Sequence, residues 1–211
     1  MTSDVEFFFD PVCPWAWITS RWVEEVAAGR DLSVTWRFIS LRLLNADKDY
    51  ATHFPPGYTE GHTLGLRLLR MAAAARETGG NEAVGRLYAE LGQRIHRPGA
   101  GLMEMEEGGT EKAVAAAGLP AELAAAQDDE RFDALLAEET QLALDRAGPD
   151  VGTPVLTFGP PDGPSFFGPV ISRVPRGEEA VTLWEATERL ARFPGFAELK
   201  RALREPPQFP R

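Results

Sequence analysis

Strand signals occur only near the two ends of this sequence, and the long stretch between them carries helical signals alone. The apolar run Val5–Phe9 predicts a buried strand, and the alternating segment Val34–Phe38 predicts a second one. Between these two segments, Ile18, Trp22 and Val26 recur at helical spacing. This order predicts a β-α-β unit whose two strands are parallel and whose crossover is right-handed.

The middle of the sequence predicts a succession of helices. A Leu- and Ala-rich segment runs from Leu64 to Arg76 and ends at Gly79-Gly80, and Asn81 is a suitable N-cap for the next helix. The last helix of this block carries apolar residues over 132–142 and is closed by a Gly-Pro pair. No segment of this block has strand character.

Strand signals return after the helical block. Val155–Phe158 and Ser165–Phe167 flank a turn rich in Gly and Pro and predict a hairpin, and Glu178–Arg192 predicts a helix. We expect a further short helix over Phe196–Arg204. The Pro-rich tail Glu205–Arg211 is expected to be loosely held.

The order of elements is therefore β-α-β, helices, then β-β-α. It predicts an α/β domain built from residues 1–45 and 148–211, with an α-helical insertion subdomain at residues 46–147. The 211 residues suffice for one domain of this kind with its own core.

The charge balance argues against nucleic acid as a partner. The chain has 22 Lys and Arg residues against 32 Asp and Glu residues, a formal net charge of −10, whereas phosphate contacts need a basic surface. The N-terminus lacks the basic and apolar regions of a signal peptide, and no apolar run approaches the roughly 18 residues of a membrane span. We therefore expect a cytoplasmic protein with no membrane partner.

The single cysteine, Cys13, lies directly after the first predicted strand and directly before a helix that begins at Pro14. Unpaired N–H groups and the positive end of the helix dipole favour a thiolate at such a place, with a pKa of roughly 3.5 to 7.5 against about 8.5 for a free thiol. The alternative is a buried structural cysteine, since free Cys is often buried. The strand-Cys-Pro-helix context favours the reactive thiol.

A second feature is Thr153-Pro154, which comes just before the strand Val155–Phe158. A proline is tolerated at the start of a strand, and an X-Pro bond can be cis. Taken alone, the pattern is better explained by an ordinary turn proline, because only about 5–6% of X-Pro bonds in folded proteins are cis.

Together the two segments resemble the DsbA-like branch of the thioredoxin superfamily. Asp10-Pro11-Val12-Cys13-Pro14-Trp15-Ala16-Trp17 is similar to its active-site segment, and Val151-Gly152-Thr153-Pro154 is similar to its cis-proline loop. Within this branch, three longer segments resemble the actinobacterial mycothiol-dependent reductase family: Trp17–Trp22, Leu91–His96 and Gly168–Ser172. Kappa-class glutathione transferases and 2-hydroxychromene-2-carboxylate isomerases are related branches. The resemblance implies a thioredoxin-like fold with an all-α insertion between the βαβ and ββα halves.

The resemblance also implies roles for individual residues. Cys13 would be the catalytic nucleophile. The residues that would form the thiol and substrate sites are Pro14, Trp15, Ala16, Asn45, Thr153 and Pro154. Of these, Thr153 would offer backbone hydrogen bonds to a bound thiol, and Pro154 would lie cis beside the sulfur. The cofactor would be a low-molecular-weight thiol, mycothiol or glutathione, and the substrate a small electrophile or disulfide. Related families are often dimers, so a homodimer stays open.

Ala16 departs from the family pattern, because dithiol members carry their resolving cysteine at this position. Ala cannot attack a mixed disulfide, so an external thiol would have to release Cys13. A monothiol oxidoreductase is therefore the favoured function. Two others stay open: a transferase or isomerase that uses a bound thiol, and a non-catalytic binding protein. A natural Ala16 and an engineered replacement of Cys are indistinguishable in the sequence.

No metal site is expected. His53, His62 and His96 lack metal-ligand spacing, and only one cysteine is available. His96 ends a predicted helix, where an imidazolium is favoured, which indicates a structural role.

Overall fold

The computed structural model describes residues 3–97, 99, 101–202 and 205–209. Its centre is a four-stranded sheet in the order β2-β1-β3-β4. The strands are β1 (Val5–Phe9), β2 (Val34–Phe38), β3 (Val155–Phe158) and β4 (Ser165–Phe167). β1 pairs with β2 in parallel and with β3 antiparallel, and β3 pairs antiparallel with β4. The predicted parallel pair and the predicted hairpin are thus confirmed.

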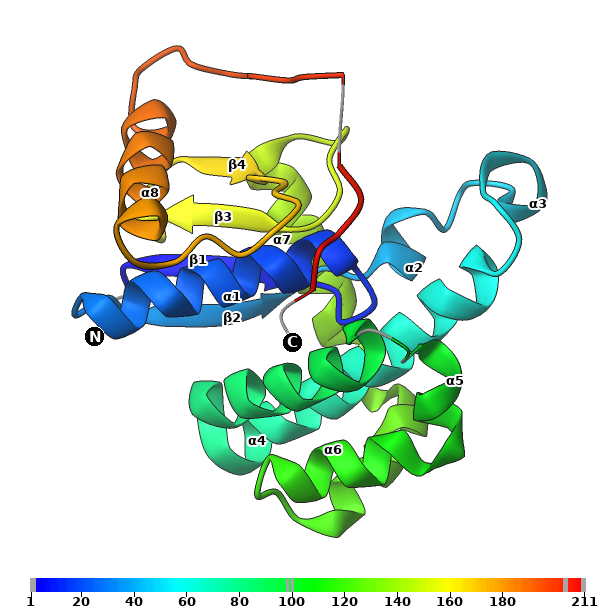
Figure 1. The fold of residues 1–211 in the computed structure, drawn as a ribbon. Coiled ribbons are helices and arrows are strands. Elements are labelled where there is room, and N and C mark those ends of the chain that lie inside the picture. The colour runs from blue at the N-terminus through cyan, green and yellow to red at the C-terminus, as the bar shows by residue number, and fades with distance from the viewer. Residues whose placement is uncertain (1–2, 98, 100, 203–204, 210–211) are drawn as a thin grey trace.

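Helices cover both faces of this sheet, because alternate residues of β1 point to opposite sides. α1 (Pro14–Gly29) and α8 (Gly177–Ala191) lie together on one face, where the rings of Trp22 and Trp184 are 5.4 Å apart (Figure 1). α7 (Asp133–Ala147) covers the other face, where Phe8 belongs to a separate apolar cluster with Ala143 and Val155.

The helices between β2 and α7 form a second layer beside the sheet (Figure 1). They are α2 (Leu41–Leu44), α3 (Tyr50–His53), α4 (Tyr58–His96), α5 (Leu102–Glu104) and α6 (Thr110–Ala116). A π-helical turn (Met105–Gly109) and two 3-10 segments (Ala121–Asp128 and Glu130–Phe132) complete the connection. Since α7 packs against the sheet itself, the boundaries 1–45, 46–147 and 148–211 stay a prediction.

The long helix α4 is kinked where the sequence predicts a break between two helices. Gly79 and Gly80 have non-helical backbone angles, and Gly80 has a positive φ of 67°. Asn81 does not serve as the predicted N-cap. Its side chain instead accepts a hydrogen bond from Trp36 N at 2.8 Å and donates one to Val34 O at 2.7 Å, along the outer edge of β2.

A buried carboxylate joins α7 to β2 and α4. Glu139 accepts from the guanidinium groups of Arg37 and Arg76 at 2.8 Å and 2.7 Å, and its other oxygen accepts from Phe38 N at 2.8 Å. Arg37 continues the network to Glu6 of β1 at 2.7 Å. The insertion is therefore tied to the sheet by charges as well as by apolar packing.

Two predictions for the C-terminal part are wrong. Residues 196–202 form no helix, because α8 ends at Ala191 and the chain turns at Pro194-Gly195, where Gly195 has a positive φ of 84°; residues 203–204 lie outside the described residues. The tail is not loosely held over 205–209. Gln208 N donates to Ser172 O at 2.7 Å, and Phe209 stacks on His96 with ring centroids 5.4 Å apart; residues 210–211 lie outside the described residues.

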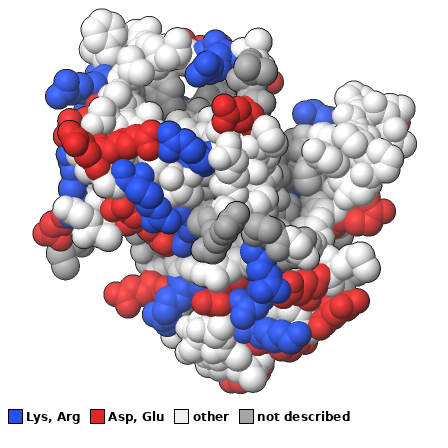
Figure 2. Space-filling model, in the orientation of Figure 1, with Lys and Arg blue, Asp and Glu red and all other residues white. Residues whose placement is uncertain are grey.

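Charged side chains of both signs adjoin one another on the face shown in Figure 2, and a hollow separates the α2–α3 segment from the rest of that face. The described helices include none that is both long enough and apolar enough to span a bilayer.

Candidate active site

Cys13 is the N-cap of α1, and its thiol is held between two backbone groups. The Sγ atom accepts from Ala16 N at 3.5 Å and donates to Thr153 O at 3.4 Å. Pro14 occupies the first helical position, where no N–H donor is needed. Because the bond to Thr153 O needs the S–H proton, this arrangement is that of a thiol.

The antiparallel pairing of β1 with β3 brings Thr153 to this thiol across 140 residues of sequence. The Thr153–Pro154 peptide bond is cis. The Thr153 hydroxyl donates to Phe8 O at 3.3 Å, so the side chain turns toward β1 and leaves the carbonyl facing the sulfur. The two sequence motifs therefore meet at one point.

The other predicted site residues lie at different distances from this point. Ala16 is buried one helical turn after Cys13, and Pro14 and Trp15 are half-buried beside it. Asn45 is the C-cap of α2, and its side-chain amide donates to Leu41 O at 2.8 Å. Its backbone oxygen accepts from Lys48 N at 3.1 Å, so the described hydrogen bonds of Asn45 are local and its place beside a substrate stays a prediction.

The predicted lowering of the Cys13 pKa is contradicted by this closed arrangement. Cys13 is only 6% exposed. Burial raises the pKa of its thiol to about 12, and the negative charge of Asp10 adds to the rise. Hydrogen bonds from the amides of Ala16 and Trp15 favour the thiolate but do not offset the loss of water.

His96 has a structural position, as predicted, but its ring is not the predicted imidazolium. Its ring lies between Trp17, at 6.0 Å, and Phe209, at 5.4 Å, and Nε2 donates to Pro11 O at 2.9 Å. Burial lowers the pKa of His96 to about 4. The imidazole is therefore neutral at pH 7 and braces the turn that leads to Cys13.

Sequence reasoning missed Asp10 as a member of the site. Its carboxylate is fully buried, and its two oxygens accept from Val12 N at 3.1 Å and Leu41 N at 2.8 Å. Its backbone oxygen also accepts from Cys13 N at 3.1 Å. The available signal was an acidic residue at the end of an apolar strand, three positions before the cysteine.

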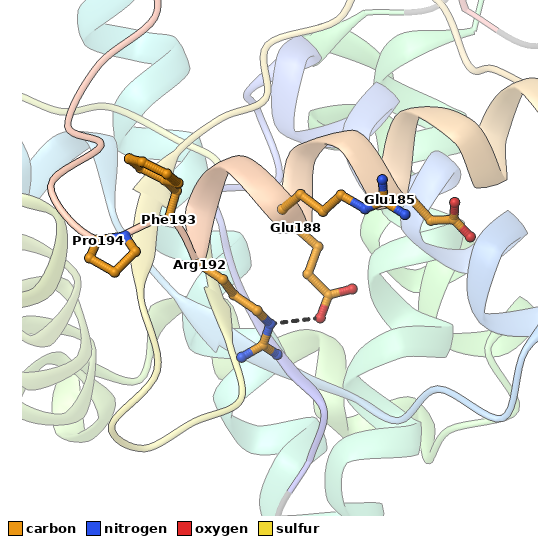
Figure 3. A pocket seen from close by; sticks show the side chains of 6 residues that line it. Glu185, Glu188, Arg192, Phe193 and Pro194 are labelled. Carbon is orange, nitrogen blue, oxygen red and sulfur yellow. Dashed lines mark hydrogen bonds and ion pairs between the residues drawn. The ribbon is translucent and has the colours of Figure 1, made fainter.

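A surface depression at the end of α8 is lined by Glu185, Glu188, Arg189, Arg192, Phe193 and Pro194, and Figure 3 shows its pair between Arg192 and Glu188 at 2.9 Å. It contains none of the predicted site residues. Within the described ranges, no three His, Cys, Asp or Glu side chains gather as a metal site would require.

Comparison with known proteins gives a family and a relative. The Rv2466c-like family model, described as mycothiol-dependent nitroreductase Rv2466c, matches residues 12–201. The uncharacterized protein Rv2286c of Mycobacterium tuberculosis (strain ATCC 25618 / H37Rv) is 30% identical over 203 residues, which cover 94% of this chain and 82% of that protein.

Two solved structures share the fold. A 2-hydroxychromene-2-carboxylate isomerase has a TM-score of 0.58 at 14% identity, with 89% of this chain and 96% of that chain covered. The cytosolic disulfide reductase DsbM from Pseudomonas aeruginosa has a TM-score of 0.56 at 18% identity, with 89% and 99% covered. The fold is therefore the DsbA-like thioredoxin fold with a helical insertion.

Proposed function

Because the chain belongs to the Rv2466c-like family of mycothiol-dependent nitroreductases, we propose that it is a thiol-dependent oxidoreductase that works through Cys13 alone. The observation that carries this proposal is the position of the only sulfhydryl group, at the start of α1 and against the carbonyl of Thr153. The proposed cofactor is a low-molecular-weight thiol. The family description favours mycothiol, and glutathione is the alternative.

The proposed reaction balances without a second cysteine in the protein. Cys13 loses its S–H proton to solvent, and its thiolate attacks a small disulfide, forms a mixed disulfide and releases one thiolate, which takes up a proton. A first small thiol displaces the second half of the substrate, and a second small thiol then frees Cys13. Two small thiols are thereby oxidised to one disulfide, and the substrate disulfide is reduced to two thiols.

The neighbouring residues have matching roles in this proposal. Thr153 offers its backbone to a bound thiol next to Pro154, and Pro14 and Trp15 form the rim through which the small thiol approaches. In this proposal Asn45 lies beside the bound substrate, because its helix α2 is tied to the Cys13 turn by the hydrogen bond from Leu41 N to Asp10. Because the proposed reaction consumes reduced small thiols, the proposed location is the cytoplasm, where such thiols are kept reduced.

The test is intact-mass analysis after exposure to oxidised mycothiol and, separately, oxidised glutathione. We expect one adduct on the wild-type chain, with mycothiol the faster reagent, and loss of the adduct when the reduced thiol is added. Cys13→Ser should form none. A wild-type thiol that reacts after unfolding but never in the folded protein would contradict the proposal.

Ala16→Cys is the matched gain-of-function variant. Cα atoms of residues three apart on a helix lie about 5 Å from one another, within the range of about 4.4–6.8 Å that a disulfide spans, so a disulfide between positions 13 and 16 is geometrically accessible. We expect this variant to release the bound small thiol by itself and to lose the adduct without added thiol. An adduct as persistent as that of the wild type would show that position 16 does not reach the mixed disulfide.

A transferase or isomerase is the second candidate, and one observation favours it. The buried Cys13 thiol has a raised pKa, and a bound external thiol could react in its place. In that case Cys13→Ser would retain turnover, and no net oxidation of the small thiol would accompany the reaction.

A further inference from the structure

Asp10 holds the turn that presents the active sulfur. Its two side-chain oxygens and its backbone oxygen accept hydrogen bonds from three separate N–H groups, those of Val12, Leu41 and Cys13. These bonds fix the path from β1 to α1 and join it to the start of α2. The backbone and side chain of Asp10 therefore together hold the turn that leads to Cys13.

The same carboxylate is buried without a cation. Within the described ranges, no Arg, Lys or His side chain pairs with Asp10, whose side chain is fully inaccessible. The backbone of α4 covers it, since a Cβ added at Gly65 would lie 2.5 Å and 3.0 Å from its two oxygens. Any negative charge on Asp10 is thus offset by backbone N–H groups alone.

The described part of α4 places two titratable groups beside this turn that carry no charge at neutral pH. They are Tyr88 and His96 of α4. Burial raises the pKa of Tyr88 and lowers that of His96 to about 4. The guanidinium of Arg21 lies over the Tyr88 ring and is paired with Glu24, and that of Arg42 lies over the Tyr50 ring. The ionisation of Asp10 therefore sets the net charge of the turn, and burial raises the pKa of Asp10 to about 7.

We propose that Asp10 is a positioning residue for the Cys13 reaction, which fixes the turn and sets a buried negative charge against the thiolate. This inference rests on the proposed role of Cys13 as nucleophile. When Asp10 is protonated, the thiolate forms without a like charge beside it. When Asp10 is ionised, the second negative charge has to be created next to the first, so the thiolate is disfavoured.

The inference predicts a distinct pH profile of Cys13 alkylation. Since Cys13 is the only cysteine, a small alkylating reagent reports this sulfur alone. Below the pH at which Asp10 ionises, the wild-type rate should rise tenfold per pH unit, as the thiolate does. It should then flatten into a shoulder near neutrality, while Asp10 ionises, and rise again above it.

Asp10→Asn should remove this shoulder. The variant is expected to react at about the wild-type rate below about pH 6 and faster above about pH 8, by about threefold for each tenfold gain in thiolate, because nucleophilicity falls as the thiol pKa falls. Asp4→Asn is the matched control. Asp4 also accepts a backbone hydrogen bond, from Ser33 N at 2.8 Å, but lies at the opposite end of β1, so the shoulder should remain.

A folded Asp10→Asn protein that keeps the shoulder, or reacts more slowly above about pH 8, overturns the inference. If the variant does not fold, carbon-13 NMR of the wild-type Asp10 carboxyl decides instead. A midpoint near neutrality supports the inference, and a midpoint at the ordinary Asp value of about 3.9 overturns it. Neither experiment needs a small thiol, so failure to form a mycothiol or glutathione adduct would count against the proposed function only.

Discussion

Gly92 shows how a single residue on α4 fixes the helix that carries the proposed nucleophile. A Cβ added at this position would overlap ring atoms of Trp17, which lies one turn after Cys13 on α1. The bare backbone of α4 therefore lies directly on the indole. This close approach, rather than any need for unusual backbone angles, explains why glycine occupies the position.

Gly92→Ala should destabilise the protein by about 1–3 kcal/mol, because the added methyl group overpacks a rigid ring. Urea denaturation measures this change in the free energy of unfolding. Gly29→Ala is the matched control, since a Cβ at Gly29 meets nothing within 4 Å. Equal stability of the two variants would mean that α4 and Trp17 separate at little cost.

At the scale of residues, the sequence predicts the reacting atom but not its environment. The strand-Cys-Pro-helix pattern and Thr153-Pro154 identify two segments that do meet in the fold. The charge states of Asp10 and His96 could not be predicted in this way. They depend on burial by Gly65 and Phe209, which are far away in the sequence and carry no recognisable motif.

The C-terminal segment 205–209 is the element whose role is least visible in the sequence. It reaches from the loop after β4 to the end of α4, because Gln208 N donates to Ser172 O and Phe209 stacks on His96. A Pro-rich tail is ordinarily expected to be mobile. Here its aromatic ring closes one side of the imidazole that braces Pro11.

Phe209→Ala should expose His96 and raise its pKa from about 4 toward the ordinary value, because burial is the cause of the lowering. NMR titration of the His96 ring measures the change. Leu199→Ala, which alters a residue that is 80% exposed, is the control and should leave His96 unchanged. A His96 midpoint that stays near 4 in Phe209→Ala would show that Trp17 and α4 bury the ring without the tail.

The lowered pKa of His96 also makes the free energy of unfolding depend on pH, and Phe209→Ala should change this dependence. The unfolded chain binds a proton at His96 near pH 6.5, whereas the folded chain binds it near pH 4. His96 therefore contributes stability that is present above the unfolded value and is lost, by about 1.4 kcal/mol per pH unit, as the pH falls through this window. Phe209→Ala should flatten this part of the pH dependence.

Elements were predictable where a local signal agrees with long-range packing. The four strands and the principal helices satisfy this condition, and so does the break in α4 at Gly79-Gly80. The expected helix after α8 does not, because Phe196 instead packs on Phe166 of β4 with ring centroids 5.6 Å apart. The apolar residues of this segment are compatible with a helix, and the sequence does not show that Phe196 packs against β4 instead.

Over the whole molecule, the network around Glu139 joins the helical layer to the sheet. Glu139 is 3% exposed, and it serves Arg37 of β2, Arg76 of α4 and the backbone of Phe38 at once. Removing it would take the shared carboxylate from two guanidinium groups, of which Arg37 would keep Glu6, and would leave Phe38 N without its partner. Such a loss is more costly than that of an exposed ion pair.

Glu139→Ala should therefore lower the free energy of unfolding by about 3 kcal/mol, which urea denaturation would measure. Glu77→Ala is the control, because Glu77 pairs with Arg131 where both side chains are more than half exposed. Its loss should cost less than about 1 kcal/mol. A similar effect of both substitutions would mean that the two layers are held together by apolar contacts alone.

Asn81 has a consequence for how copies of this chain can associate. An edge strand normally offers its unpaired N–H and C=O groups as a template for strand addition. On β2 the groups of Trp36 and Val34 are already used by the Asn81 amide. An intermolecular sheet built from this protein would therefore have to extend from β4, at the opposite edge.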